Sequence, residues 1–389
     1  MRVLGLVFTV GVSLEQWNRQ GLLSREKQIY EEYLEKRKFD KIIWFTYGKN
    51  DRELRNKLVR EGKLHAQIEV VSIPKFFIGK YKNQMYSYLL PYLHRQECEQ
   101  LDVIKSNQMG GAWTAAKIHQ MYGIPFILRT GYTYTSNFLQ TLQSEKNIKQ
   151  KIKIRYLLFK YRHIENKMYH RCNVATVSSF HDKRYICETY GIDEEKVINV
   201  GNYIDCAQFR SVDINEKEDR FIFVGRISKE KNLFNIIKGL SKAGVGIDIY
   251  GEGDLEEEVA RFIKKNDFDA KLMGVVENNK LPYVLNQYKY YILASEHEGM
   301  PKALLEAMAC GLVCIGTDVD GINEVIENEK NGFLARSVDY LDIYKVVEKM
   351  KACCYIEEIR NNAQKYIKTH FSVEKVVESE WNILSNYIK

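Results

Sequence analysis

Short apolar runs alternate with helical patterns along almost the whole chain. In the first half, runs rich in β-branched and aromatic residues predict strands at Val3–Val10, Lys41–Thr46, Gln67–Ser72, Val103–Lys105, Pro125–Leu128, Val174–Val177 and Val197–Val200. Helical periodicity separates most of them, for example over Arg25–Glu35, Tyr81–Glu97 and Trp113–Met121. Strands that alternate with helices are typical of a parallel sheet covered on both faces.

A polar interval from Asp213 to Arg220 interrupts this alternation, and we interpret it as a linker region. After it, strands are predicted at Phe221–Val224, Gly246–Tyr250, Lys271–Met273, Tyr290–Leu293 and Val313–Gly316. The pattern therefore predicts an α/β fold with two doubly wound, Rossmann-like domains and a cleft between them. Ligands of such sheets bind beyond the carboxyl ends of the strands.

The last predicted helix, Val373–Ile388, follows both halves, and we expect it to pack back across their junction. We accordingly place a first domain at residues 1–205 plus 373–389 and a second at residues 206–372. A length of 389 residues agrees with two domains, because single hydrophobic cores rarely serve so long a chain.

The eight cysteines are scattered without a Cys-x-x-Cys pair, which favours free thiols in a reducing compartment. The apolar start, Met1–Val10, is interpreted as a buried strand and not as a signal peptide, because it runs directly into a polar helix. No window reaches the length of a transmembrane helix. We expect a cytoplasmic protein, at most peripheral on the inner face of the plasma membrane.

The net charge is +7, and part of it is concentrated in residues 146–163, where seven lysines and arginines occur without an acidic residue. Aliphatic and aromatic residues are interleaved with these cations. This pattern is typical of a helix on an anionic membrane surface, but it also fits an ordinary solvated helix. Nothing else resembles a nucleic-acid-binding module, so no nucleic-acid partner is expected.

Two glutamates, Glu298 and Glu306, stand eight residues apart. Pro301 suits the first helical position, so we expect Glu298 on a loop and Glu306 in the second turn of a helix. The neighbours of Glu306 are almost all apolar, and a carboxylate there is costly to bury unless it is hydrogen-bonded. We interpret Glu306 as a binding group for hydroxyls of a polar ligand. The alternative is a glutamate on a solvated helix face.

A glycine turn and two cations follow the first strand of the second half. Gly225 and Arg226 come directly after this strand, and Lys231 stands where the next helix begins. Backbone amides and the positive end of a helix favour an anion there. Arg226 can bind a phosphate through two parallel hydrogen bonds, and Lys231 adds a point charge. The sequence predicts an anion site, although surface lysines beside a helix give a similar pattern.

Two further glycine turns follow the next strands. Gly251 and Gly253 permit a tight turn close to a ligand, and a plain turn with Asp254 as a helix N-cap is the open alternative. Gly274, before Val275 and Val276, could present backbone groups to a nucleobase.

Two Asp-x-Asp triplets occur, at residues 267–269 and 318–320. Such pairs can hold a divalent cation against a diphosphate. Turn chemistry explains both equally well, so we expect no metal and no other cofactor.

Residues 221–334 resemble the C-terminal domain of retaining glycosyltransferases of the GT-B fold, family 4, known as glycosyl transferases group 1. Order and spacing match over more than a hundred residues, whereas the first half matches only in general layout. The matching elements are Gly225-Arg226 with Lys231, Gly251-Glu252-Gly253, Gly274, Ser295–Pro301, the Glu298/Glu306 pair, Ala307–Gly311, Glu324–Ile326 and Asn331-Gly332.

The resemblance implies roles for these residues. Arg226 and Lys231 would hold the diphosphate of a nucleotide-sugar and stabilise it as a leaving group. Glu306 would accept hydrogen bonds from ribose hydroxyls, and Glu298 would contact the donor sugar. The implied donor-binding set is Gly225, Arg226, Lys231, Gly251, Gly253, Gly274, Glu298, Gly299, Met300, Pro301 and Glu306, with Arg226, Lys231 and Glu298 as its catalytic members.

On the acceptor side the candidates are Gly11, Arg129 and Tyr132, for which a structural role in loops is the alternative. The expected function is transfer of a sugar, with retention, from a nucleotide-diphosphate donor to a hydroxyl of a saccharide acceptor. The basic segment favours a lipid-linked acceptor, as in bacterial surface polysaccharide synthesis. The alternative is a soluble acceptor.

Two other classes of protein share parts of this pattern. A nicotinamide-dependent oxidoreductase has the same layout, but here no Gly-x-Gly-x-x-Gly follows the first strand. A non-catalytic scaffold would tolerate the loss of Glu306.

Overall fold

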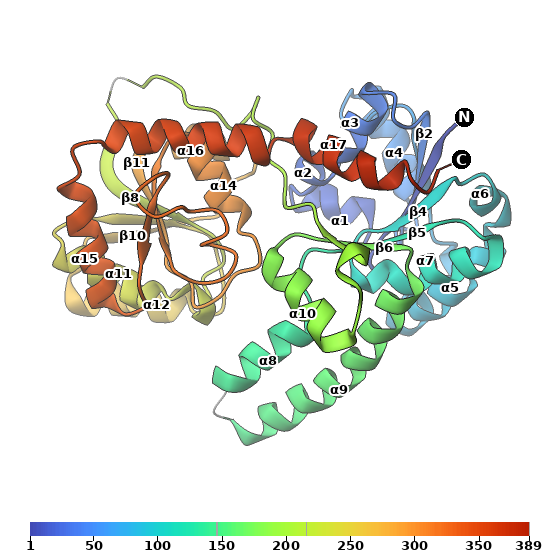
Figure 1. The fold of residues 1–389 in the computed structure, drawn as a ribbon, viewed down its shortest axis with the longest axis horizontal. Helices are drawn as coiled ribbons and strands as arrows, with labels where there is room; N and C mark the ends of the chain where they lie inside the picture. The colour runs from blue at the N-terminus through green and yellow to red at the C-terminus, as the bar shows by residue number, and fades with distance from the viewer. Residues whose placement is uncertain (145–146, 215, 389) are drawn as a thin grey trace. The chain divides into compact units, whose positions relative to one another are not determined.

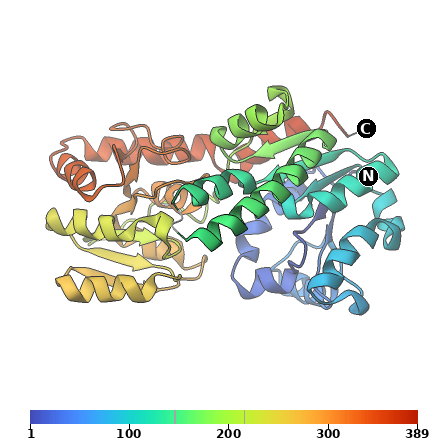
Figure 2. The same ribbon diagram turned by 90° about the horizontal axis from the view of Figure 1, so that it is seen from below.

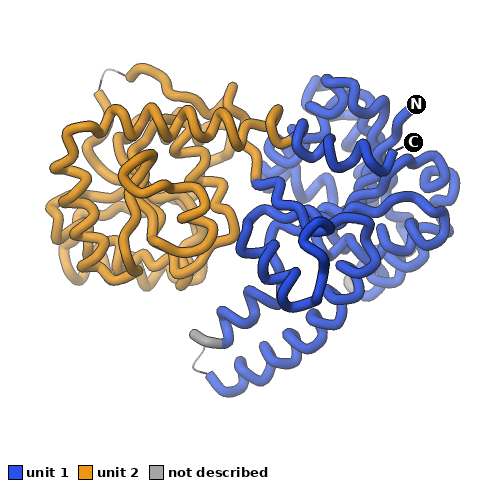
Figure 3. The backbone as a smooth tube through the Cα atoms, viewed as in Figure 1, with its two compact units in different colours: residues 1–201, 377–389 blue, residues 202–376 orange. Residues whose placement is uncertain are grey.

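The computed structural model describes residues 1–144, 147–214 and 216–388, which form two compact units. Unit 1 comprises residues 1–201 and 377–389, and unit 2 comprises residues 202–376 (Figure 3). The chain therefore passes into unit 2 after Gly201 and returns to unit 1 within the last helix, α17 (Val373–Leu384). Each unit is described by itself below.

Unit 1 contains a seven-stranded parallel sheet in the order β3-β2-β1-β4-β5-β6-β7 (Figure 1). Its strands are β1 (Val3–Val7), β2 (Lys41–Phe45), β3 (Ile68–Val71), β4 (Val103–Ser106), β5 (Phe126–Thr130), β6 (Val174–Val177) and β7 (Val197–Asn199). The central strands are buried along their whole length, as expected of a sheet covered on both faces.

Helices surround this sheet in both views (Figures 1 and 2). They are α1 (Leu14–Arg19), α2 (Leu23–Glu26), α3 (Gln28–Glu35), α4 (Asp51–Arg60), η1 (Lys75–Phe77), α5 (Lys80–Leu93), α6 (Arg95–Glu99), α7 (Met109–Tyr122), α8 (Tyr134–Ser144), α9 (Ile148–Arg171), α10 (Phe180–Tyr190) and η2 (Glu194–Lys196).

Unit 2 contains a six-stranded parallel sheet in the order β10-β9-β8-β11-β12-β13. Its strands are β8 (Glu218–Val224), β9 (Ile247–Tyr250), β10 (Ala270–Gly274), β11 (Tyr288–Leu293), β12 (Val313–Thr317) and β13 (Phe333–Ala335). Its helices are η3 (Lys229–Lys231), α11 (Leu233–Lys242), α12 (Glu256–Asn266), α13 (Leu281–Asn286), α14 (Lys302–Ala309), α15 (Tyr340–Lys351) and α16 (Ile356–His370). In both sheets the order reverses beside the first strand, as in doubly wound folds.

Several expected boundaries were wrong. The polar interval 213–220 is not the junction between the units, because the chain enters unit 2 earlier and Glu218–Arg220 already belong to β8. The predicted helix over residues 25–35 is divided at Lys27, and the one over residues 81–97 ends at Leu93 before α6. Helix α17 ends at Leu384, and strand β13 was not predicted.

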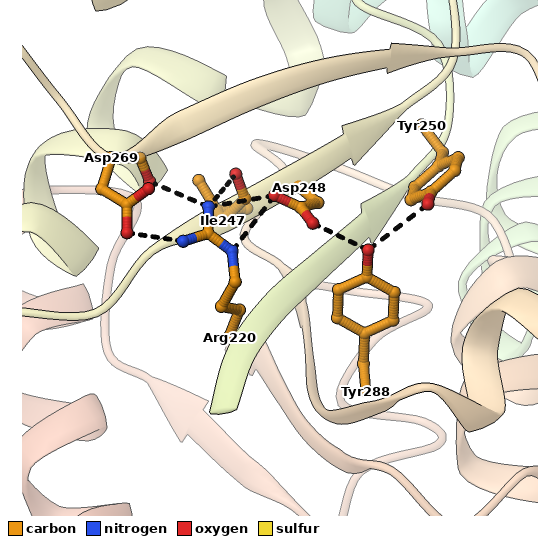
Figure 4. A network of polar contacts seen from close by, with 6 residues as sticks. All are labelled: Arg220, Ile247, Asp248, Tyr250, Asp269 and Tyr288. Atoms are coloured by element: carbon orange, nitrogen blue, oxygen red, sulfur yellow. Dashed lines mark hydrogen bonds and ion pairs between the residues drawn. The ribbon is translucent and has the colours of Figure 1, made fainter. Parts of the chain in front are cut away.

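A polar network links strands β8, β9 and β11 of unit 2 with the segment before β10 (Figure 4). The Arg220 guanidinium donates to Asp248 at 3.0 Å and to Asp269 at 2.5 Å. The Tyr288 hydroxyl donates to Asp248 at 2.8 Å and lies 3.3 Å from the Tyr250 hydroxyl. This network pairs a half-buried cation with its carboxylates, and it explains Asp269 of the first Asp-x-Asp triplet as a structural residue.

Candidate functional site

Three loops of unit 2 follow the carboxyl ends of β8, β9 and β10. The amide of Gly225 donates to the Tyr250 carbonyl at 3.0 Å, and the amide of Gly251 donates to the Gly274 carbonyl at 2.8 Å. These bonds continue the ladder of the parallel strands past their ends. Because neighbouring parallel strands end at the same edge of a sheet, the sequence segments that carry these glycines are brought together there.

Two of these glycines are required by close contacts between the loops. Gly251 has φ +148°, and a Cβ atom there would lie 1.8 Å from the Gly225 carbonyl oxygen. A Cβ atom at Gly253 would lie 2.3 Å from the carbonyl oxygen of Ile227. Both distances are well inside van der Waals contact, so any side chain would push the loops apart.

The loops form the wall of a cavity of about 820 Å³, within the usual size range for ligand sites of roughly 300–1,000 Å³. Arg226 supplies the cation of this cavity, and Glu252, Asp254 and Glu256 supply carboxylates. The cavity wall thus carries charges of both signs. The other lining residues are Val224, Gly225, Tyr250, Gly251, Gly253, Val275 and Val276.

Lys231 forms an ion pair with Glu298, in the loop that follows β11. Their side chains are only 17% and 12% exposed, so solvent screens the pair weakly. The Ser295 hydroxyl donates to the same Glu298 oxygen at 2.7 Å. The Lys231 loop and the Glu298 loop are also tied together through the backbone, since the Glu296 amide donates to the Glu230 carbonyl at 2.8 Å. Glu298 is thus held in one orientation by two donors.

Glu230 was not singled out from the sequence, although it lies between the two predicted cations. Burial opposes ionisation of its carboxyl, but hydrogen bonds from the Ser228 hydroxyl and the backbone, with the charges of Lys231 and Arg226, lower its pKa. The Ser228 hydroxyl donates at 2.5 Å. Glu230 is therefore a carboxylate in the same loop as the two predicted cations, and its ionised form is favoured.

Glu306 lies on α14 and is only 4% exposed, among the buried residues of this helix. The helix begins at Lys302 with Pro301 as its N-cap, one residue later than expected. Met300 is also buried, and its carbonyl accepts from the Asn202 side chain at 2.7 Å. No sequence pattern linked Asn202 to this loop, because Asn202 lies about a hundred residues before Met300 in the chain.

The loop that carries Glu298 is fixed by a second glycine contact. Gly321 has φ +80°, and a Cβ atom there would lie 1.9 Å from the Gly299 carbonyl oxygen. The Thr317 hydroxyl donates to the Ser295 carbonyl at 2.7 Å. Residues of the loops after β11 and β12 therefore hold each other in place.

The model of the family described as glycosyl transferases group 1 matches residues 206–370. This match covers most of unit 2, which is therefore similar to the group 1 glycosyltransferases. A curated relative, the UDP-Gal:alpha-D-GlcNAc-diphosphoundecaprenol alpha-1,3-galactosyltransferase of Escherichia coli, is 26% identical over 231 residues, which are 54% of this chain and 59% of that protein. This chain thus spans less than two thirds of that relative's length.

Solved structures match nearly the whole chain. The sucrose-phosphate synthase of Thermosynechococcus elongatus matches with a TM-score of 0.77 at 12% identity, covering 99% of both chains. The Anabaena protein HepE in complex with UDP-glucose matches with a TM-score of 0.70 at 14% identity, covering 99% of this chain and all of that chain. At these identities the likeness concerns the fold, and it confirms two doubly wound domains of the GT-B type.

The acceptor-side candidates lie in unit 1, on β5 and in the loops that follow β1 and β5. Gly11 has φ +84° in the loop before α1, and Tyr132 is 43% exposed with its ring 5.3 Å from that of Tyr134. Arg129 lies on β5 and donates to the Asn107 carbonyl at 3.2 Å. These three residues are outside unit 2, which carries all the donor-side candidates.

The second Asp-x-Asp triplet, at residues 318–320, is not part of a cluster of metal-ligating side chains among the described residues. Asp318 accepts from the Asn323 side chain at 2.9 Å. Within residues 1–144, 147–214 and 216–388, no group of three or more His, Cys, Asp or Glu side chains could hold a metal ion. Asp254 is not an N-cap, since α12 begins at Glu256 after Leu255.

Proposed function

We propose that this protein transfers a sugar, with retention, from a nucleoside-diphosphate donor to a hydroxyl of a lipid-linked saccharide in bacterial surface polysaccharide synthesis. The observation that carries the proposal is the pairing of Lys231, in the loop that also carries Arg226 of the cavity wall, with Glu298 in the loop after β11. The family match of unit 2 and the UDP-glucose complex of a protein with the same fold support a nucleotide-sugar donor. The E. coli relative, named for a diphosphoundecaprenol substrate, supports a lipid-linked acceptor.

In this proposal the diphosphate lies beside Arg226 and Lys231. The Lys231 ammonium has three donors, so it can bind a phosphate oxygen while it keeps Glu298. Glu298 then presents its second carboxylate oxygen to a hydroxyl of the donor sugar. Glu306 accepts from the ribose, and the turns at Gly251, Gly253 and Gly274 allow the nucleotide to approach the backbone.

Transfer breaks the bond between the anomeric carbon and the diphosphate oxygen and forms a bond to the acceptor oxygen on the same face of the sugar. The acceptor proton passes to the departing phosphate oxygen, whose negative charge the two cations stabilise. Glu298 binds in this scheme and does not attack, because the donors from Lys231 and Ser295 weaken it as a nucleophile. Analysis of the product anomer by NMR tests the scheme, and an inverted product would refute it.

Donor binding is tested by thermal shift with UDP, UDP-sugars and NAD, because a ligand that binds only the folded state raises its apparent stability. We expect a shift with UDP-sugars that is lost in Arg226→Gln and Lys231→Gln. Lys229→Gln removes a charge from an exposed position of the same turn and serves as the matched control. A shift with NAD alone would favour the oxidoreductase.

The role of Glu306 has a sharper test. A hydrogen bond to a charged group contributes about 1.5–3 kcal/mol, so wild type should bind UDP roughly 10- to 150-fold more tightly than its 2′-deoxy analogue. Glu306→Gln should shrink this ratio, whereas Glu256→Gln, on the cavity wall, should leave it unchanged. An unchanged ratio in Glu306→Gln would place the ribose elsewhere.

We further propose that residues 146–163 contact an anionic membrane. Lys146 lies outside the described residues, and residues 148–163 belong to α9. Ile148, Ile152, Tyr156 and Phe159 are 62–79% exposed and recur at intervals of three or four residues, so they form one apolar stripe. Lysines and arginines flank this stripe on both sides. No helix of the described chain combines the length and the apolar character that crossing a bilayer requires.

A further inference from the structure

A groove in unit 1 lies where α5, α7 and α9 meet, far along α9 from the apolar stripe. It has a volume of about 380 Å³. The aromatic side chains of Tyr88, Tyr92 and Trp113 line it together with the cations of Lys117, Lys167 and Arg171. Figure 1 shows the three helices side by side. No residue of the donor site contributes to this groove.

The groove is built from side chains that hold one another. The rings of Tyr88 and Trp113 meet edge to face with centroids 4.8 Å apart. The Lys167 ammonium lies 5.5 Å from the Trp113 ring centroid, and the Lys117 ammonium lies 5.8 Å from that of Tyr92. Cations over aromatic faces are held in place at little conformational cost. They keep their remaining hydrogen-bond donors for an anion.

Two hydrogen bonds fix α5 on α7 and so preform the groove. The Thr114 hydroxyl donates to the Ser87 carbonyl at 2.9 Å, and the Tyr122 hydroxyl donates to the Pro91 carbonyl at 2.5 Å. The buried Met168 contributes the third helix to the lining. A preformed groove loses less conformational entropy when a ligand binds.

The exposed charges on the three helices that line the groove are positive. Helices α5 and α7 contain no aspartate or glutamate. Helix α9 carries eight lysines and arginines and a single carboxylate, Glu165, which is buried and accepts from the Tyr134 amide and the Tyr190 hydroxyl. The three helices that line the groove thus present cations and no exposed carboxylate, and this complementarity favours a phosphate group.

Exposed side chains of α5 and α9 extend this surface beyond the groove. On α5, Tyr81, Met85, Tyr88 and Tyr92 recur at intervals of three or four residues, and all are 42–87% exposed. The exposed line on α9 continues from Phe159 through three polar residues, His163, Asn166 and His170, which form a shallow hollow that shares Lys167 and Arg171 with the groove. Thus the apolar stripe of α5 borders the groove, and the apolar stripe of α9 lies farther along the same exposed helix face.

We propose that this groove binds the headgroup phosphate of an anionic glycerophospholipid while the α5 and α9 stripes enter the lipid surface. Aromatic residues that are apolar on one side and polar on the other suit the boundary between water and lipid. The inference extends the proposed membrane contact of α9 and rests on it for the orientation of unit 1. It does not depend on the donor site.

The test uses the full chain and three sets of substitutions. The groove variant carries Lys117→Gln, Lys167→Gln and Arg171→Gln, and the stripe variant carries Ile152→Ser, Tyr156→Ser and Phe159→Ser. The matched control removes three exposed lysines of unit 2, by Lys264→Gln, Lys265→Gln and Lys271→Gln, and has the same net charge as the groove variant.

Binding is measured by flotation with vesicles of phosphatidylglycerol and phosphatidylcholine. Each cation near an anionic surface strengthens partitioning about fivefold, so the groove variant should bind roughly a hundredfold more weakly. The control variant should lose far less. Equal binding by the groove and control variants would overturn the proposal, because general charge would then explain the attraction.

A second measurement separates the groove from the stripes. Soluble dihexanoyl phosphatidylglycerol should change the fluorescence of Trp113, identified by comparison with Trp113→Phe. The stripe variant should keep this response and the groove variant should lose it. If inorganic phosphate gives the same response at the same concentration, the groove is a site for free anions and the lipid proposal is wrong.

The donor measurements keep the proposals distinct. Both variants should retain the thermal shift with UDP-sugars, since their substitutions lie outside unit 2. If the groove variant loses vesicle binding but keeps its thermal shift with UDP-sugars, the lipid-headgroup proposal is supported, whichever reaction the protein catalyses. Normal vesicle binding by the stripe variant would contradict the membrane contact of α9. The Trp113 response to soluble phosphatidylglycerol would still test whether the groove binds the headgroup.

Discussion

A buried ion pair ties the C-terminal helix to the sheet of unit 1. Lys105 on β4 is fully buried, and its ammonium binds the Glu380 carboxylate of α17, which is 1% exposed. The Tyr33 hydroxyl of α3 donates to the same carboxylate. Removing one partner of such a pair leaves a buried charge uncompensated and costs about 3–5 kcal/mol. Glu380→Ala should therefore destabilise unit 1 by this amount, a large share of the roughly 5–15 kcal/mol of a typical domain.

Tryptophan fluorescence during urea unfolding measures this effect in unit 1 alone. All four tryptophans, Trp17, Trp44, Trp113 and Trp381, lie in that unit. Glu378→Ala is the matched control, because Glu378 lies on the same helix as Glu380 but is 46% exposed, and its pair with Lys38 is near the surface. Such surface pairs contribute at most about 1 kcal/mol.

A triple variant with Tyr33→Phe, Lys105→Met and Glu380→Leu tests the reason for the loss. Replacement of a whole buried pair by apolar residues is often neutral or stabilising, so this variant should recover most of the stability. Should Glu380→Ala cost no more than Glu378→Ala, the buried charge would not be the cause of the destabilisation and the reasoning would fail.

The pair also predicts a pH dependence. Burial alone would raise the pKa of Glu380, but the Lys105 charge and the hydrogen bonds from Lys105 and Tyr33 outweigh it and lower the pKa. Its contribution is therefore complete above the unfolded-state pKa of about 4.3 and is lost as pH falls through the lower folded-state value. The stability of wild type relative to the triple variant should decrease on acidification below about pH 4.

Three further predictions concern other parts of the chain. Gly251→Ala places a methyl carbon 1.8 Å from a carbonyl oxygen, so it should lower the melting temperature and abolish the thermal shift with UDP-sugars; a normal shift would show that this turn is not part of the donor site. In native protein, dithionitrobenzoate should react first at exposed Cys354 and leave Cys98 unreacted until unfolding, since burial raises the pKa of the Cys98 thiol to about 12. Tyr288→Phe removes a hydrogen bond to the buried Asp248 and should cost unit 2 about 1.5–3 kcal/mol by calorimetry, and no change would mean that Arg220 alone satisfies that carboxylate.

Much of the fold followed from local sequence patterns. The alternation of apolar runs with helical periodicity located most strands to within a few residues, because a strand buried on both faces must be apolar throughout. Ends of elements were less accurate. The polar interval 213–220 was misplaced because charged residues at an exposed strand start look the same in sequence as a linker. Strand β13 was missed because three residues give too little periodicity.

The sequence by itself determined which residue types stand in the donor loops: two cations, two glutamates and the glycines between them. Only the tertiary structure decided how they meet. It pairs Lys231 with Glu298, joins the loops of Glu230 and Glu296 through a backbone hydrogen bond, and brings Gly251 into close contact with the Gly225 carbonyl. It also places the aromatic residues of α5 and α7 beside the cations of α9. Contacts between residues far apart in the chain depend on how strands and helices stack, and no local pattern of hydrophobicity or charge encodes that geometry.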